Sequence, residues 1–234
     1  MSLFVPKRRP QVELLDRGDL PPEEIEKSLA DIRFVNRCWG GLRTAESAAL
    51  RLLEADGSRR ASLLDLGSGT ADVALAVARR AKRRGICVRV VALDVQLAHL
   101  CAARRVSGSG APDLLAADAT RLPVADRSFD WVFSSLFLHH LSPEENIHVL
   151  SEMARVARRG LFVVDLRRHR VARWIVGLLG PIFFRSPVSV ADGCASVEQA
   201  YTIDEVAEMA RGAGLDRFEL RTVAPFRLEL SART

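Results

Sequence analysis

The feature that most constrains the fold is the stretch LDLGSGTAD, residues 64–72, in which a short apolar run ends in a glycine-rich turn. Residues 71–84 follow with the spacing of a helix. A strand, a tight turn and a helix in this order begin a βαβ unit. Gly67 and Gly69 carry no Cβ, so the backbone can turn sharply there and approach a ligand closely. The stretch therefore predicts a parallel sheet with a ligand site at its first turn.

The alternation of strand and helix continues along the chain. Apolar runs predict strands over residues 61–66, 87–93, 113–117, 129–134 and 160–166, and helices are expected between them. Capping boxes at residues 142–145 and 202–205 mark two helix starts. Two last strands, 218–223 and 226–230, form a hairpin. The chain is therefore expected to be an α/β protein with a Rossmann-like, seven-stranded, mostly parallel sheet, helices on both faces, and an antiparallel C-terminal strand at one edge.

The first 60 residues lack strand patterns. Apolar side chains three or four residues apart over residues 25–39 predict an amphipathic helix that ends at Gly40, and a second helix is expected over residues 45–55. We expect residues 1–60 to form a helical lid and residues 61–234 to form the main domain. An insertion at about 171–200 is expected to contribute to the substrate pocket.

Composition and charge argue against a cysteine-ligated metal centre, a secreted protein and a membrane-spanning protein. The net charge is +5, but the arginines are spread along helices, as on solvated faces. The four cysteines show no metal-ligand spacing, so no metal is expected. Residues 1–10 lack an apolar signal-peptide segment, and the longest apolar run, 174–184, is shorter than the roughly 20 residues that span a bilayer. A cytoplasmic protein without a membrane span is expected, and its oligomeric state is left open.

Three acids, Asp65, Asp94 and Asp118, end successive strands, where ligands of open α/β sheets bind. Each of the last two can also be read as a turn or helix-cap residue. The dinucleotide fingerprint fails because Asp72 stands at its third glycine position, and no lysine completes a P-loop. An acid-flanked glycine turn disfavours phosphate and suits a cation. The sulfonium compound S-adenosylmethionine fits this requirement.

The motifs LDLGSGTAD, VVALDV, AADATRLPVADRSFDWVFSSLFLHHL and GLFVVDL resemble those of class I S-adenosylmethionine-dependent methyltransferases, closest to the ubiquinone/menaquinone-biosynthesis branch (methyltransferase domain type 11). The resemblance covers residues 60–230. It implies that the turn lines the methionyl end of the cofactor, that Asp94 binds the ribose, and that Asp118 binds the adenine. Ala71 replaces a customary glycine. The candidate cofactor contacts are Asp65, Gly67, Ser68, Gly69, Asp94, Val95, Asp118, Ala119 and Ser134.

The acceptor is predicted to be a small apolar or aromatic molecule of phenol, quinol or polyketide type, methylated by direct displacement in secondary metabolism. Candidate general bases are His139, His140 and His169. Candidate substrate contacts are Phe34, Trp39, Arg167 and Arg168. Each of these residues can also be read as packing, capping or solvated. Nucleic acid is not expected as a partner, because residues 134–137 read SSLF rather than an amino-methylating Asn-Pro-Pro-Tyr type run. The alternatives are an RNA or protein methyltransferase and a non-catalytic cofactor-binding domain.

Overall fold

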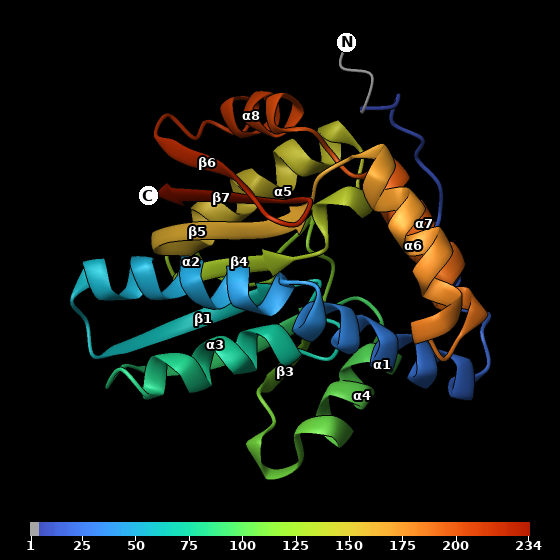
Figure 1. Ribbon diagram of the computed structural model, residues 1–234. Coiled ribbons are helices and arrows are strands. Elements are labelled where there is room, and N and C mark those ends of the chain that lie inside the picture. The colour runs from blue at the N-terminus through green and yellow to red at the C-terminus, as the bar shows by residue number, and fades with distance from the viewer. Residues whose placement is uncertain (1–4) are drawn as a thin grey trace.

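Seven strands form a single sheet in the order β3-β2-β1-β4-β5-β7-β6 in the computed structural model, which describes residues 5–234 (Figure 1). Residues 1–4, part of the stretch without a signal-peptide pattern, lie outside the described residues. The strands are β1 (Arg60–Leu66), β2 (Cys87–Asp94), β3 (Asp113–Ala116), β4 (Phe129–Ser135), β5 (Ala157–Leu166), β6 (Phe218–Val223) and β7 (Arg227–Arg233).

Strands β1 to β5 pair in parallel, and β7 is antiparallel to both of its neighbours, β5 and β6. The predicted fold class is therefore confirmed. The reversed strand lies one position inside the edge, because the tight hairpin places β6 outside β7. The carboxyl ends of the five parallel strands meet at one edge of the sheet, where ligands bind in such folds.

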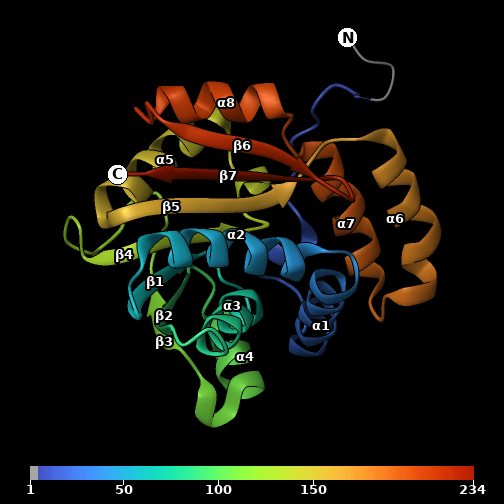
Figure 2. The same ribbon diagram turned by 60° about the vertical axis from the view of Figure 1, so that its left-hand side comes forward.

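Helices cover both faces and the carboxyl edge of the sheet (Figures 1 and 2). Helices α2, α3 and α4 pack on one face, and α5 and α8 pack on the other. The α-helices are α1 (Pro22–Cys38), α2 (Gly41–Asp56), α3 (Asp72–Lys82), α4 (Leu97–Ser107), α5 (Pro143–Val156), α6 (Arg170–Phe183), α7 (Pro187–Gln199) and α8 (Ile203–Gly212). Short 3₁₀ helices are η1 (Leu14–Arg17), η2 (Gly108–Gly110) and η3 (Leu138–His140).

Local sequence signals explain where several helices begin. At the start of α5 the Ser142 hydroxyl accepts the N–H of Glu145, whose carboxylate accepts the N–H of Ser142 at 2.7 Å. Thr202 and Glu205 do the same for α8. Both predicted capping boxes are thus confirmed. Helix α3 begins at Asp72, one residue later than predicted, because Ala71 adopts a left-handed φ of 55°.

The two faces of the sheet have separate apolar cores. The aromatic side chains Trp131, Phe133 and Phe162 pack under α2 and α3 and are almost fully buried. Ala45, Ala48 and Leu53 place α2 in this core. Helix α2 therefore supports the sheet, and only the part of the predicted lid that precedes residue 40 stands over its carboxyl edge. The domain boundary at residue 60 stays a prediction.

Four helices, η1, α1, α6 and α7, stand together across the carboxyl edge (Figure 2), and we call them the lid. Two buried carboxylates connect its first half, η1 and α1, to its second half, α6 and α7. Asp192 of α7 accepts the N–H groups of Leu14 and Leu15 at 2.7 and 2.9 Å. Asp31 of α1 accepts the N–H groups of Arg185 and Ser186. Residues before 40 and the predicted insertion thus form one covering layer.

Candidate active site

A cavity of about 720 Å³ lies between the carboxyl edge of the sheet and the lid. One end is formed by the glycine turn after β1 and by the ends of β2 and β3. A second end is formed by η1, η3 and α7, and it adjoins the first where the Gln96 side-chain amide donates to the Asp16 carbonyl at 3.2 Å. The middle is apolar and is lined by side chains of α1, α6 and the loop before β7. These include Ile32, Val35, Trp39, Ile175, Leu179, Phe184 and Phe226.

The glycine turn has the open backbone that the sequence predicts. Gly67 and Gly69 have φ angles of 62° and 53°, a region that favours glycine. The Gly69 N–H donates to Asp94 Oδ2 at 2.9 Å, and the Gln96 N–H donates to Asp94 Oδ1 at 2.8 Å. A Cβ on Gly69 would meet nothing within 4 Å, whereas one on Gly67 would lie 2.7 Å from Cγ of Phe137. Gly69 therefore faces open space in the cavity, and Gly67 makes room for an aromatic ring.

Asp65 is a buried carboxylate without a donor. Its exposed fraction is 3%, it lines the cavity, and no hydrogen bond from residues 5–234 reaches its oxygens. Burial, together with the charges of Asp72 and Asp94, raises the pKa of the Asp65 carboxyl well above its ordinary value. A bound cation would stabilise the carboxylate form. This end of the cavity thus fits the ammonium and sulfonium groups of S-adenosylmethionine and repels phosphate.

The other predicted cofactor contacts divide in two groups. Ser68, Val95, Asp118 and Ala119 all line the cavity. Asp118 is exposed, and its Oδ1 accepts the N–H and the hydroxyl of Thr120, which fixes the turn after β3. Ser134 does not line the cavity and is fully buried. Strand β4 runs one residue further than predicted, so Ser134 lies inside the sheet and Ser135 takes the place at the cavity.

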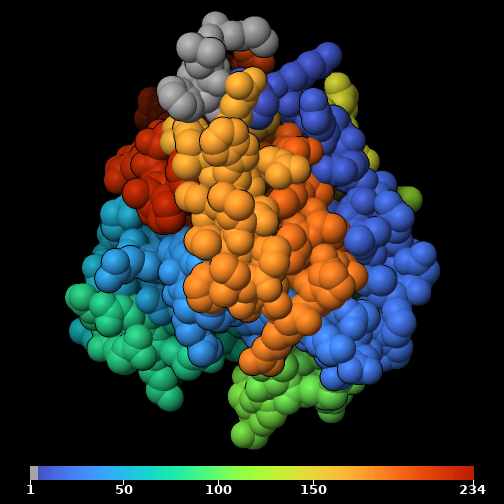
Figure 3. Space-filling view, turned by 45° about the vertical axis from the view of Figure 1, so that its right-hand side comes forward, coloured from blue at the N-terminus to red at the C-terminus, as the bar shows by residue number. Residues whose placement is uncertain are grey.

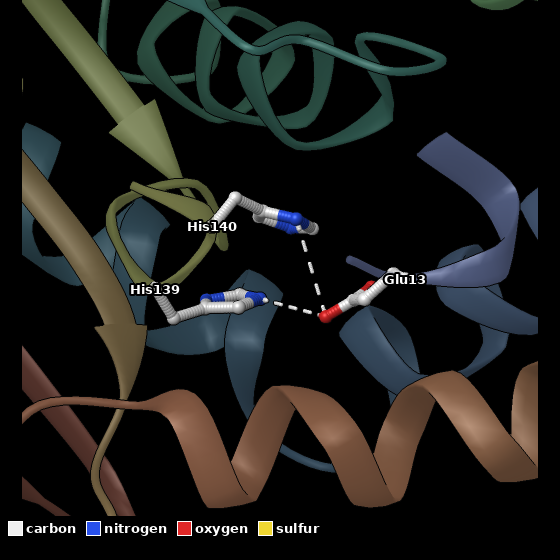
Figure 4. Close-up of side chains that lie close together, drawn as sticks. All are labelled: Glu13, His139 and His140. Carbon is white, nitrogen blue, oxygen red and sulfur yellow. Dashed lines mark ion pairs between the residues drawn. The ribbon is translucent and has the colours of Figure 1, made fainter. Parts of the chain in front are cut away.

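The end of the cavity formed by η1, η3 and α7 holds a cluster of acids and histidines, of which Figure 4 shows Glu13, His139 and His140. His139 Nδ1 lies 2.6 Å from Oδ1 of Asp165, near the end of β5, and both side chains are buried. His139 Nε2 points the other way, to Glu13 Oε1 at 3.7 Å. The ring of His140 lies 4.3 Å from that of His139, and His140 Nδ1 lies 2.8 Å from Asp16 Oδ2. Segments distant in sequence therefore meet at one polar centre.

The ionisable groups of this cluster shift one another's pKa values. Burial alone would lower the pKa of His140, but the carboxylates of Glu13 and Asp16 raise it from 6.5 to about 9. Burial alone would likewise raise the pKa of Asp165, but its interaction with His139 holds that pKa below the ordinary value. At neutral pH the centre thus contains a protonated His140 and an ionised Asp165.

Glu13 is held in place from α7. Its Oε1 accepts the Ser196 hydroxyl at 2.6 Å and the Gln199 amide at 2.7 Å. One ligand atom each from Glu13, His139 and His140 lie within 4.8 Å of one another, a spacing at which a metal ion can be shared. The expectation that the protein uses no metal stays a prediction.

Four of the predicted substrate or base residues make contacts elsewhere in the structure and do not line the cavity. Arg168 is 4% exposed and pairs with Glu205 at 2.7 Å, because the backbone after β5 pairs with Tyr201, which lies just before α8. Arg167 and His169 do not line the cavity, and His169 accepts the Val171 N–H as the N-cap of α6. Phe34 stacks on Phe183, 6.2 Å away. Trp39, by contrast, lines the cavity as predicted.

Several residues of the cavity were not predicted from the sequence. Asp165 was detectable, since it occupies the same place in the GLFVVDL strand that Asp65 and Asp94 occupy in theirs. Glu13 and Asp16 lie in a segment without a motif, and nothing in the sequence connects them to the histidines. Arg227, at the start of β7, also lines the cavity, and its guanidinium is almost completely buried.

The sheet order, the reversed β7 and the acid-flanked glycine turn define the class I S-adenosylmethionine-dependent methyltransferase fold. Solved structures agree. A methyltransferase from Aquifex aeolicus superposes with a TM-score of 0.62 at 19% identity, covering 92% of this chain and 99% of that one. Magnesium protoporphyrin IX methyltransferase of Synechocystis, solved with bound S-adenosylmethionine, gives a TM-score of 0.55 at 17% identity over 96% of this chain and 86% of that one.

Sequence comparison finds relatives over part of the chain. Residues 63–160 match the family described as methyltransferase domain. The ubiquinone/menaquinone biosynthesis C-methyltransferase UbiE of Bordetella avium is 28% identical over 67% of this chain, and the malonyl-[acyl-carrier protein] O-methyltransferase of a Marinomonas species is 38% identical over 44%. The chain spans 64% of the first relative and 36% of the second. The predicted family resemblance is confirmed, and with it the cofactor class. Among residues 5–234, no helix combines the length and apolar character needed to cross a bilayer.

Proposed function

We propose that the protein binds S-adenosylmethionine at the glycine-turn end of the cavity and methylates a hydroxyl group of a small aromatic acceptor at the other end. The observation that carries the proposal is the His139–Asp165 pair. His139 of this pair lines the same cavity as the unpaired carboxylate of Asp65, and apolar side chains of α1 and α6 line another part of that cavity. An activated methyl group, an apolar acceptor and a base would therefore meet in one enclosure.

The cofactor, when bound, supplies an electrophilic methyl group that passes from sulfur to the acceptor oxygen. The protein supplies binding and proton transfer. Asp65 and Asp94 hold the cationic and ribose ends of the cofactor. Asp165 accepts a hydrogen bond from the His139 Nδ1–H, which leaves Nε2, 3.7 Å from Glu13 Oε1, as the atom that takes the proton of the substrate hydroxyl. That proton moves to Nε2 as the new bond between carbon and oxygen forms and the bond between carbon and sulfur breaks.

The acceptor class follows from the walls of the cavity. Trp39, Phe184 and Phe226 are aromatic, and the α1 and α6 side chains beside them are aliphatic. Such walls exclude water and suit a ring with few polar groups. Phenols, quinols and aromatic polyketides share this character and carry an acidic hydroxyl. A role in secondary metabolism is part of this proposal.

Calorimetry with S-adenosylhomocysteine tests the cofactor half of the proposal. Wild type should bind, and Asp94→Ala should bind roughly 10- to 100-fold more weakly, because hydrogen bonds to a charged group contribute about 1.5–3 kcal/mol. Asp113→Ala is the matched control, since Asp113 is exposed at the start of β3 and lies outside the cavity lining. Absence of binding by wild type would overturn the cofactor assignment.

Methyl transfer from radiolabelled S-adenosylmethionine tests the acceptor half. The probes are hydroquinone, 4-hexylresorcinol, total bacterial RNA and a bacterial protein extract. Label in 4-hexylresorcinol that His139→Ala no longer produces supports the proposal. Label in RNA or protein would favour the rival enzyme classes. Cofactor binding without any transfer to the phenolic probes would count against the phenolic acceptor and favour a non-catalytic binding domain.

A further inference from the structure

Helix α6 carries an apolar stripe on its outer side. Trp174, Leu178 and Ile182 follow one another at four-residue intervals and are 66%, 73% and 72% exposed. Side chains four apart lie on one face of a helix, so these three form a continuous strip. Val171, 37% exposed, extends it at the N-terminal end. Figure 3 shows α6 as a ridge at the front of the molecule, with no other described element covering it.

The fold does not need this stripe. Ala172, Val176 and Gly180, on the opposite side of α6, are buried against α7 and its neighbours and already anchor the helix. Isolated exposed apolar residues are common, but a contiguous apolar strip on one helix marks an interaction surface. What contacts the stripe must therefore be sought outside residues 5–234.

The charged side chains of α6 and of the residues directly after it are all basic. Residues 170–185 contain Arg170, Arg173 and Arg185 and no acid. Arg170 and Arg185 are exposed at the two ends of the helix, whereas Arg173 pairs with Glu198 at 2.7 Å. Two acids of α1 lie near the C-terminal end of α6: Asp31 is buried and accepts the N–H groups of Arg185 and Ser186, and Glu24 accepts the Ser186 hydroxyl and pairs with Lys27. An apolar face with arginines at its ends is the pattern of a helix that lies in the surface of an anionic bilayer.

The same helix forms a wall of the cavity. Ile175, Val176 and Leu179 line the cavity from α6, and Leu179 is also 39% exposed. Only one helix thickness thus separates the outer stripe from the apolar space inside. A partner surface that bound the stripe would therefore lie directly beside the wall that α6 forms for the cavity.

We propose that α6 binds the surface of anionic lipid membranes, lying parallel to it with the stripe in the outer acyl region and Arg170 and Arg185 among the headgroups. The helix has 14 residues, about 21 Å, and lies on the bilayer rather than across it. If the proposed function holds, the consequence for the acceptor is direct. The cavity then receives amphipathic phenols or quinols that are dissolved in the lipid, and S-adenosylmethionine comes from the aqueous side.

Vesicle flotation tests the surface independently of any methyl transfer. Wild type should float with vesicles of equal phosphatidylglycerol and phosphatidylcholine and bind pure phosphatidylcholine at least several-fold more weakly. The double variant Leu178→Gln with Ile182→Gln should lose about tenfold or more of this binding. Arg170→Gln with Arg185→Gln should bind the anionic vesicles several-fold more weakly. Val106→Gln, at an exposed apolar residue of α4, is the matched control and should bind as wild type does.

Two results would overturn the proposal. One is wild type that stays off both kinds of vesicle. The other is a stripe variant that binds as well as wild type. Sedimentation of the lipid-free protein checks a different occupant: a dimer that the Leu178→Gln and Ile182→Gln changes dissociate, with no vesicle binding, would assign the stripe to a second copy. Calorimetry with S-adenosylhomocysteine shows that the stripe variant is folded, and it separates failure of this proposal from failure of the proposed function.

Discussion

The two ends of the cavity are built in different ways. At the proposed cofactor end the chemistry comes from short stretches, residues 65–72 and 94–96. Much of it is backbone, namely two glycines and two N–H groups that donate to Asp94, and one carboxylate, that of Asp65, accepts no hydrogen bond from residues 5–234. At the proposed acceptor end the chemistry comes from side chains of η1, η3, β5 and α7 that are far apart in sequence. The first end is defined by local sequence, and the second exists only after the lid has packed onto the sheet.

This difference predicts that the two ends respond separately to mutation. Changes at the polar centre should alter turnover and leave cofactor affinity unchanged, whereas changes at the turn should alter affinity. The predictions below are ordered by the size of the expected effect.

The largest effect is expected at the base. His139→Ala should lower kcat by roughly 10²–10⁴-fold, the usual contribution of a general base. Asp165→Asn should have a similar effect, because an amide N–H facing Nδ1 leaves the proton on Nε2, where it blocks the acceptor. The measurement is transfer of radiolabel to 4-hexylresorcinol, with S-adenosylhomocysteine affinity as the control. A variant that loses both in equal measure would show that the two ends are not independent.

Asp65 should give the next largest effect, on affinity alone. Asp65→Asn removes the charge that faces the ammonium group of S-adenosylhomocysteine, and affinity should fall roughly 10- to 100-fold. Because the pKa of Asp65 is raised, the wild-type affinity should increase with pH above 3.8, as the carboxyl loses its proton. Calorimetry at several pH values checks both points. A variant that keeps the pH dependence of wild type would place the titrating group elsewhere.

His140 should make stability depend on pH. Its pKa is raised from 6.5 to about 9, so its pairing with Glu13 and Asp16 stabilises the fold fully below pH 6.5. This contribution, on the order of 2 kcal/mol, is lost as the pH rises through 9. The difference in free energy of unfolding between wild type and His140→Gln should therefore shrink from pH 6 to pH 10. A difference that is constant across this range would contradict the assigned pairing.

Ala71 should give the smallest effect. Its left-handed φ of 55° is strained for alanine by about 1–2 kcal/mol, which Ala71→Gly would relieve. The methyl group is fully buried, and its loss costs about 0.8 kcal/mol. These terms nearly cancel, so stability should change by less than about 1 kcal/mol, and the affinity for S-adenosylhomocysteine should change little. A large gain in affinity would mean that the ligand lies against Ala71 rather than Gly69.

The strands, the glycine turn and the acids at the strand ends could be predicted from the sequence, because strand, turn and acid succeed one another within a few residues. Prediction from the sequence fails where long-range packing decides. Arg167 and Arg168 follow β5 as a cationic pair, but Arg168 turns away to Glu205 on α8. Ser134 is misplaced because the end of a strand depends on its neighbour, and Ser135 still pairs with Val164 of β5. Glu13 reaches His139 only through contacts with α7, which no periodicity reveals.

The buried carboxylates of Asp31 and Asp192 also have a kinetic consequence. Each accepts backbone N–H groups from a segment 154 to 178 residues away in the chain. The two halves of the lid therefore separate together, and the amides of Leu14, Leu15, Arg185 and Ser186 report on a single opening event. In deuterated water these four amides should exchange at a common rate, and a ligand that fills the cavity should slow all of them by the same factor.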